Sequence, residues 1–135
     1  MKRQITNRED VAFLVKTFYE KVRKDEHLGP IFNGIIKDWD AHLEKLTDFW
    51  EGNLFVFVKT KFTGDPAQAH HRVDVAMNGT IEMEHFGRWI NLWIANLDEY
   101  FEGERAESAK NQARKMATFL YLKIFEKRRH DNSMA

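Results

Sequence analysis

The sequence predicts an all-α fold in which four main helices pack around one core. Apolar residues recur at spacings of three and four along four long segments, which is the period of an amphipathic helix. Turn-forming residues such as Gly64-Asp65-Pro66 separate these segments. The one stretch with strand-like composition, residues 55–59, continues a helical period and has no partner strand, so it is assigned to a helix. The length of 135 residues fits a single domain over residues 1–135.

The first expected helix begins near Thr6 and extends over about four turns. Thr6-Asn7-Arg8-Glu9 has the form of a capping box, in which a hydroxyl or amide caps the helix and Glu9 follows three residues after Thr6. Residues Asp25 to Pro30 are expected to interrupt this helix, with Gly29-Pro30 as the break, and residues 31–36 are too few for more than a turn or two of helix. The apolar face of the first helix consists of Val11, Leu14, Val15, Phe18, Tyr19 and Val22.

The second long helix is expected from about Asp38 to about Val58. Gly64-Asp65-Pro66 ends this segment, and a short helix is expected from Ala67 to Val73. The apolar stripe of the long helix consists of Trp39, His42, Leu43, Leu46, Phe49, Trp50 and Leu54.

Two further long helices account for the C-terminal half. Thr80 can cap the first of them, and residues 102–104 separate it from the second. Residues 1–5 and 128–135 are expected to fray. The two stripes consist of Phe86, Trp89, Ile90, Trp93, Leu97, Tyr100 and Phe101, and of Ala106, Ala109, Ala113, Met116, Ala117, Leu120, Tyr121, Ile124 and Phe125.

The composition narrows the classes of function. The 21 basic and 21 acidic residues balance, which gives no electrostatic case for nucleic acid or an anionic membrane as a partner. The absence of cysteine excludes disulfides, thiolate metal sites and thiol nucleophiles. Neither a signal-like segment nor a membrane-spanning run is present, so we expect a cytoplasmic protein. The eleven Phe, four Trp and three Tyr either fill a core or line the pocket of a flat ligand.

Two histidines are candidate metal ligands. His42 lies on the apolar stripe of the second long helix, and His70 follows the Gly64-Asp65-Pro66 turn. A neutral imidazole that faces an apolar cavity suits iron or zinc. Each residue alone has a simpler interpretation, His42 as a satisfied core or boundary residue and His70 as a surface residue.

Four sequence patterns, taken together, resemble the group III truncated hemoglobins, or 2/2 globins. Their order and spacing extend from about Thr6 to Phe125, nearly the whole chain. The patterns are Phe18-Tyr19-Glu20-Lys21-Val22 with Asp25-x-x-Leu28-Gly29-Pro30-Ile31-Phe32, Trp39-x-x-His42-Leu43-x-x-Leu46-x-x-Phe49-Trp50, Gly64-Asp65-Pro66-x-x-x-His70, and His85-Phe86-Gly87-Arg88-Trp89-x-Asn91-Leu92-Trp93.

The resemblance implies haem b (iron protoporphyrin IX) in a two-over-two helical sandwich. The first two long helices would pair against the two C-terminal helices. The resemblance implies His70 as the proximal iron ligand, four residues after Pro66, in preference to its neighbour His71. It implies a distal pocket formed by Tyr19, His42 and Trp89. The cofactor contacts that it implies are Phe32, Trp39, His42, Leu43, Leu46, Trp50, His70, Val73, Phe86, Trp89 and Trp93.

Three kinds of function stay open. The favoured one is a haem protein that reversibly binds a diatomic gas (oxygen, NO or CO) at five-coordinate iron, as a monomer. The protein would be an enzyme if it also detoxified NO or reduced peroxide with electrons from a reductase, and the sequence leaves this alternative open. A non-haem di-iron or zinc bundle is discounted because Glu82-x-x-His85 is the only Glu-x-x-His pair. A helical interaction domain without a cofactor explains the stripes, but not the aromatic residues near His42 and His70.

Overall fold

The structure is a computed structural model that describes residues 2–55 and 83–134. Within these ranges the chain is all helical, as expected, with one isolated bridge between Arg3 and Phe101. The described helices are α1 (Arg8–Lys24), α2 (Leu28–Ile35), α3 (Trp39–Leu54), α5 (Met83–Tyr100) and α6 (Glu104–Met134).

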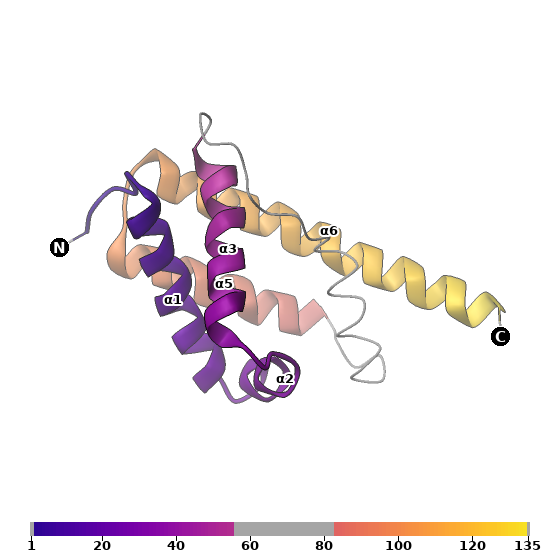
Figure 1. Cartoon of the computed structure of the whole chain (residues 1–135). Coiled ribbons are helices and arrows are strands. Elements are labelled where there is room, and N and C mark those ends of the chain that lie inside the picture. Colours follow the sequence, from indigo (N-terminus) through magenta and orange to yellow (C-terminus); the bar gives the residue numbers. More distant parts are fainter. Residues whose placement is uncertain (1, 56–82, 135) are drawn as a thin grey trace.

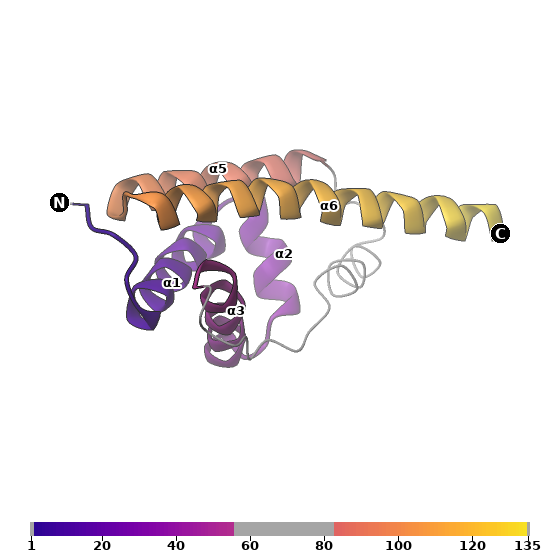
Figure 2. The ribbon, with the colours of Figure 1, turned by 90° about the horizontal axis from the view of Figure 1, so that it is seen from above.

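The helices form two layers. Helix α1 packs against α3 in one layer, and α5 packs against α6 in the other (Figures 1 and 2). Helix α1 also contacts α5 across the layers, and the short helix α2 contacts both α1 and α5. The expected pairing of the first two long helices against the two C-terminal helices is therefore confirmed.

The start of α1 differs by one residue from the expected capping box. Asn7 is the N-cap, and its side-chain oxygen accepts a hydrogen bond from the backbone N–H of Asp10 at 2.9 Å. The Asp10 carboxylate in turn accepts hydrogen bonds from the backbone N–H and the hydroxyl of Thr6. Asn7 and Asp10 thus take the positions assigned to Thr6 and Glu9, but the Asp10 side chain bonds to Thr6, one residue before the N-cap, where a capping box would have it bond to the N-cap N–H.

The interruption of the first helix at Asp25 is confirmed, because α1 ends at Lys24 and Asp25 is its C-cap. The prediction that Gly29-Pro30 breaks the helix is wrong, because both residues lie in the first turn of α2. Proline fits there because the first-turn N–H groups have no partner within the helix. The carboxylate of Asp25 makes the turn by accepting hydrogen bonds from the backbone N–H groups of His27 and Leu28, each at 2.9 Å.

Helix α3 is shorter than expected. It ends at Leu54, and Phe55 has an extended backbone, so the assignment of Phe55 to this helix is wrong. Residues 56–58, the Ala67–Val73 helix and the Thr80 cap lie outside the described residues. The separation of the last two helices is confirmed: Gly103 lies between α5 and α6 with a φ of 98°, a conformation that favours glycine.

The N-terminal segment contacts the turn between α5 and α6. Ile5 is buried, and the backbone of Arg3 forms hydrogen bonds with Tyr100 and Glu102. The segment around Arg3 therefore lies against the α5–α6 turn. Helix α6 extends to Met134, and the expected fraying of residues 128–135 stays a prediction. None of the described helices combines the length and apolar character needed to cross a membrane.

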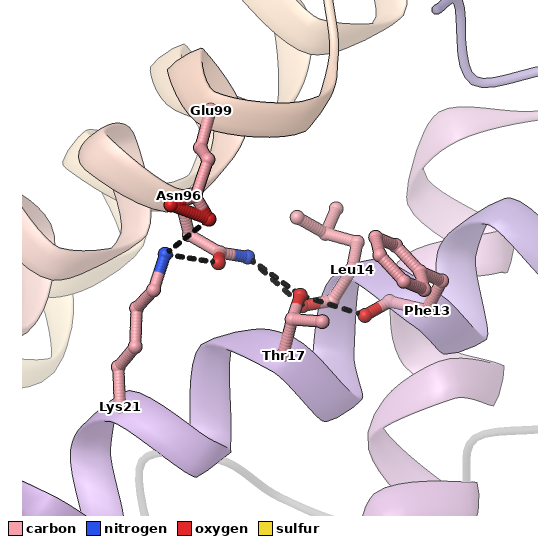
Figure 3. Close-up of polar contacts among 6 residues, drawn as sticks. All are labelled: Phe13, Leu14, Thr17, Lys21, Asn96 and Glu99. Carbon is pink, nitrogen blue, oxygen red and sulfur yellow. Dashed lines mark hydrogen bonds and ion pairs between the residues drawn. The ribbon is translucent and has the colours of Figure 1, made fainter. Parts of the chain in front are cut away.

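A buried polar cluster fixes the register of α1 against α5. Asn96, fully buried on α5, donates from its side-chain nitrogen to the Leu14 carbonyl at 3.2 Å and to the Thr17 hydroxyl at 3.0 Å (Figure 3). Its oxygen accepts a hydrogen bond from Lys21 at 2.7 Å, and Lys21 also pairs with Glu99. Another alignment of the two helices would separate these partners and leave polar groups unsatisfied. Unsatisfied polar groups are costly in a core, so the cluster favours this alignment.

Candidate functional site

Tyr19 lies at the centre of an aromatic cluster drawn from three helices. Its side chain is only 7% exposed on α1. Ring centroids of Phe32 on α2 and of Trp39 and His42 on α3 lie 5.8 to 5.9 Å from the Tyr19 ring. Phe18 packs edge-on against it at 4.8 Å. Three residues that the sequence assigned to the site thus surround the buried phenol of a fourth, Tyr19.

Trp89 reaches this cluster from the opposite layer. Its ring lies 5.4 Å from Phe18, and its side chain is hydrogen-bonded to Tyr19. Burial raises the pKa of Tyr19 to about 12, although the hydrogen bond from Trp89 works in the opposite direction. An indole N–H can only donate, so the Tyr19 oxygen is the acceptor and its own O–H is left to donate. The phenol stays neutral at ordinary pH.

The first turn of α3 sets the position of His42. Asp38 caps the helix by accepting a hydrogen bond from the Ala41 N–H, and the His42 N–H bonds to the Asp38 carbonyl. Trp39 and His42 are three residues apart and therefore lie on one helix face. Their rings meet edge-on with centroids 5.7 Å apart. Both side chains are half-buried, so the apolar stripe of α3 presents them at the edge of the core rather than within it.

The remaining predicted contacts on α3 and α5 divide between the core and its edge. Leu43 and Leu46 are half-buried and pack against the main core cluster. Trp50 and Trp93 are buried and stacked at 4.6 Å, and the Trp93 N–H donates to the Ala109 carbonyl. Trp89 stacks on Trp93 in turn, with an angle of 2° between the rings. The three indoles therefore form a stack that leads from the core to the half-buried Trp89.

Phe86 and Phe32 belong to the second part of the core. Phe86 is buried in a smaller cluster with Ile31 and the C-terminal half of α6, where its ring lies 5.7 Å from Tyr121. Phe32 is half-buried and packs against both clusters. It therefore links the Tyr19 cluster to the Phe86 side of the molecule.

The proximal half of the predicted site cannot be placed. His70, His71 and Val73 lie outside the described residues, and so does Glu82 of the Glu82–His85 pair. Within residues 2–55 and 83–134, no three His, Asp or Glu side chains are grouped to hold a metal ion.

The chemistry of the described side chains fits a flat, apolar cofactor such as haem. Phe32, Trp39, Leu43 and Leu46 offer a half-buried apolar wall, which suits a planar ring system. Tyr19 and its hydrogen bond from Trp89 add a buried donor in the same cluster. A pocket of mainly apolar side chains with few, well-placed polar groups is the usual character of a cofactor site.

Two residues that sequence reasoning did not assign to the site contact it. Phe18 contacts Tyr19, Trp89 and Trp93 edge-on, and its place on the first apolar stripe marked it only as core. Arg23 lies with its guanidinium carbon 4.5 Å from the centre of the Trp39 ring. No sequence pattern signals this contact, because it depends on how α1 and α3 meet.

Comparisons with known proteins give a consistent result. No protein-family model matches the chain. The chain is similar to the group 3 truncated hemoglobin ctb of Campylobacter jejuni, with 33% identity over 122 residues, covering 87% of this chain and 91% of the relative. A crystal structure of the group III truncated hemoglobin from Campylobacter jejuni matches the fold with a TM-score of 0.79 and 31% identity, covering 92% of this chain and 95% of the other.

Proposed function

Because the chain belongs to the group III truncated hemoglobins, we propose that it binds haem b and holds oxygen or a related diatomic ligand beside Tyr19. Membership makes it a globin-type haem protein; the type of haem and the identity of the ligand are our proposal. The observation that carries the proposal is the buried Tyr19 hydroxyl, which lies in an aromatic cluster with His42 and accepts a hydrogen bond from Trp89.

The residues of the site have distinct roles in this proposal. When bound, haem would supply an iron atom that can take a diatomic ligand. His70 would hold the iron from the proximal side, and a partner on its second ring nitrogen would fix the tautomer. Phe32, Trp39, Leu43 and Leu46 would cover the apolar faces and edges of the ring system and exclude water.

The distal side chains would stabilise a ligand that carries partial negative charge. Trp89 donates to the Tyr19 oxygen, which orients the phenol and strengthens its O–H as a donor. Tyr19 would then donate to the ligand in a site with little competing water. Oxygen, which would carry partial negative charge there, should benefit from this donor more than carbon monoxide, which would carry less.

A second candidate function is redox chemistry such as NO detoxification or peroxide reduction with the help of a reductase. The buried Tyr19 hydroxyl with its hydrogen bond from Trp89 favours this function too, because a hydrogen-bond donor beside a bound peroxide would also assist cleavage of its O–O bond. Steady consumption of NO or peroxide by the purified protein with a chemical reductant would separate turnover from reversible binding.

The test of haem binding is a visible spectrum of the purified full chain with added haem. We expect an intense Soret band that shifts between the ferric, ferrous and carbonyl forms, with stoichiometric uptake. His70→Ala should lose or greatly weaken this band, whereas His71→Ala should retain it, because a single imidazole holds the iron. The opposite pattern in the two variants would move the ligand assignment to His71, and a wild-type chain without a Soret band would refute the proposal.

A further inference from the structure

Where α1 and α3 meet, Arg23 contacts the ring of Trp39, which belongs to the aromatic cluster around Tyr19 and His42. Arg23, exposed in the last turn of α1, lies with its guanidinium carbon 4.5 Å from the centre of the Trp39 ring. A guanidinium over an indole face is attracted by the negative face of the ring. Trp39 is the first residue of α3, so this contact joins the end of one helix to the start of another.

Arg23 is held from two other directions. Its Nε donates to the side-chain oxygen of Asn33 at 3.2 Å, and the Asn33 nitrogen donates back to the Arg23 carbonyl at 3.2 Å. Gly29 packs so closely against the Arg23 backbone that a Cβ at position 29 would lie 2.5 Å from the Arg23 carbonyl oxygen. Helix α2 therefore fixes both the backbone and the side chain of Arg23.

Among the described residues, Trp39 is the side chain that links the guanidinium of Arg23 to His42 and Tyr19. Trp39 lies 5.7 Å from His42 and 5.8 Å from Tyr19, measured between ring centroids. His42 in turn lies 5.8 Å from Tyr19. The three rings touch one another, so a displacement of Trp39 removes the support of His42 on one side.

We propose that Arg23 is a positioning residue that clamps Trp39 and thereby holds His42 against Tyr19, which slows the entry of diatomic ligands. This inference rests on the proposed function for its kinetic effect, although the clamp itself is a feature of the chain. Side chains that must move before a ligand enters set the association rate, so a looser Trp39 permits faster entry.

The experiment compares Arg23→Gln with Lys24→Gln in the full chain. Both substitutions remove one positive charge from an exposed residue in the last turn of α1, but only the first removes the cation over Trp39. After flash photolysis of the carbonyl form, we expect Arg23→Gln to rebind carbon monoxide from solvent about two- to fivefold faster, which corresponds to the ~0.5–1 kcal/mol of an exposed cation–π contact. Lys24→Gln should match the wild type.

A second readout follows the contact directly and needs no haem. The indole N–H signal of Trp39 in an ¹⁵N spectrum, assigned with Trp39→Phe, should shift in Arg23→Gln and stay in place in Lys24→Gln. Arg23→Lys, which keeps a cation but loses the planar guanidinium, should fall between the wild type and Arg23→Gln in both measurements.

The outcomes separate the clamp from the proposed function. If the chain takes up no haem, the proposed function fails, and the Trp39 signal alone decides whether the contact exists. An unchanged Trp39 signal in Arg23→Gln overturns the clamp. Equal rebinding rates in wild type and Arg23→Gln, or equal acceleration in Lys24→Gln, overturn its role in ligand entry.

Discussion

The Tyr19 hydroxyl can accept one hydrogen bond and donate another. Its oxygen accepts from Trp89, and in the proposed function its proton would be donated to the diatomic ligand. A hydrogen bond to a partly charged acceptor in a dry site is worth about 1.5–3 kcal/mol. Since each ~1.4 kcal/mol is a factor of ten, the phenol can change the lifetime of a bound ligand by one to two orders of magnitude.

The first prediction concerns the release of oxygen and carbon monoxide. Tyr19→Phe should raise the oxygen release rate by about ten- to a hundredfold, because it removes the donor and keeps the ring. Trp89→Phe should change the rate in the same direction, since Tyr19 loses the group that orients it. Carbon monoxide carries less charge and should respond much less. Stopped-flow displacement measures both rates, and equal changes for the two gases would mean that these residues act by bulk instead.

The buried phenol also predicts a response to alkaline pH. The pKa of Tyr19 is raised from 10.0 to about 12, so between these values the unfolded chain releases a proton that the folded chain keeps. The contribution of neutral Tyr19 to stability is therefore complete below pH 10 and is lost as the pH rises toward 12. Denaturant unfolding of the wild type and of Tyr19→Phe at pH 9 to 12 tests this. The wild type should lose stability more steeply, and parallel curves would contradict the burial of an uncharged Tyr19.

The residues of the site were predictable to the extent that they share one helix face or one family pattern. Trp39 and His42 lie three residues apart on a stripe, so their meeting follows from helical geometry. Their contact with Tyr19 came from the resemblance, because helical periodicity does not say which stripes face each other. Arg23 could not be predicted, since its contact with Trp39 depends on the angle at which α2 joins the two helices.

The start of helix α2 shows that the same local pattern can mark the end of one helix or the beginning of the next. Gly29-Pro30 has the composition of a helix break, yet the pair stands in the first turn of a helix. Proline ends a helix that precedes it and is compatible with one that begins there, and the sequence alone does not distinguish the two. Gly29 is required for another reason, the close approach of α2 to the Arg23 carbonyl.

This packing predicts opposite effects for two glycine substitutions. Gly29→Ala should destabilise the fold by about 1–3 kcal/mol, because its Cβ would lie 2.5 Å from the Arg23 carbonyl oxygen and backbone would have to move. At Gly87 on α5, the new Cβ meets none of the described residues within 4 Å, so Gly87→Ala should stabilise the fold by about 0.5–1 kcal/mol through helix propensity. Chemical denaturation of both variants checks the sign, and stabilisation by Gly29→Ala would show that α2 packs less closely than described.

The end of α3 marks the limit of periodicity as a guide. The helical spacing continues through the sequence into residues 55–58, but Phe55 is extended. Its ring packs under the Arg105 guanidinium at 4.4 Å, and Arg105 also donates to the Ile5 carbonyl. A contact between α6, the N-terminal segment and the end of α3 thus outweighs local preference, as tertiary context often does.

The two layers depend on side chains from opposite ends of the chain. Ile5 and Arg3 tie the N-terminal segment to the α5–α6 turn, and Asn96 fixes α1 against α5. The Arg88 side chain of α5 pairs with the Asp25 carboxylate at 2.7 Å. Burial opposes the charge on Asp25, but Arg88 and the two backbone N–H groups outweigh it and lower its pKa to about 2. The ion pair between Arg88 and Asp25 therefore contributes fully above the ordinary Asp pKa and is lost only as the pH falls toward 2.

The half-buried wall between the layers predicts that haem stabilises the whole molecule. Phe32, Trp39, Leu43 and Leu46 pack against the core without being fully buried, so a flat cofactor that covers them binds the folded state alone. At a free haem concentration of about 100 times the Kd, this linkage adds ~2.7 kcal/mol, or roughly 10 °C in melting temperature for a domain of this size. Calorimetry of the chain with and without haem measures the shift. His70→Ala should lose most of it, and identical melting curves for the two forms of the wild type would mean that no cofactor is buried between the layers.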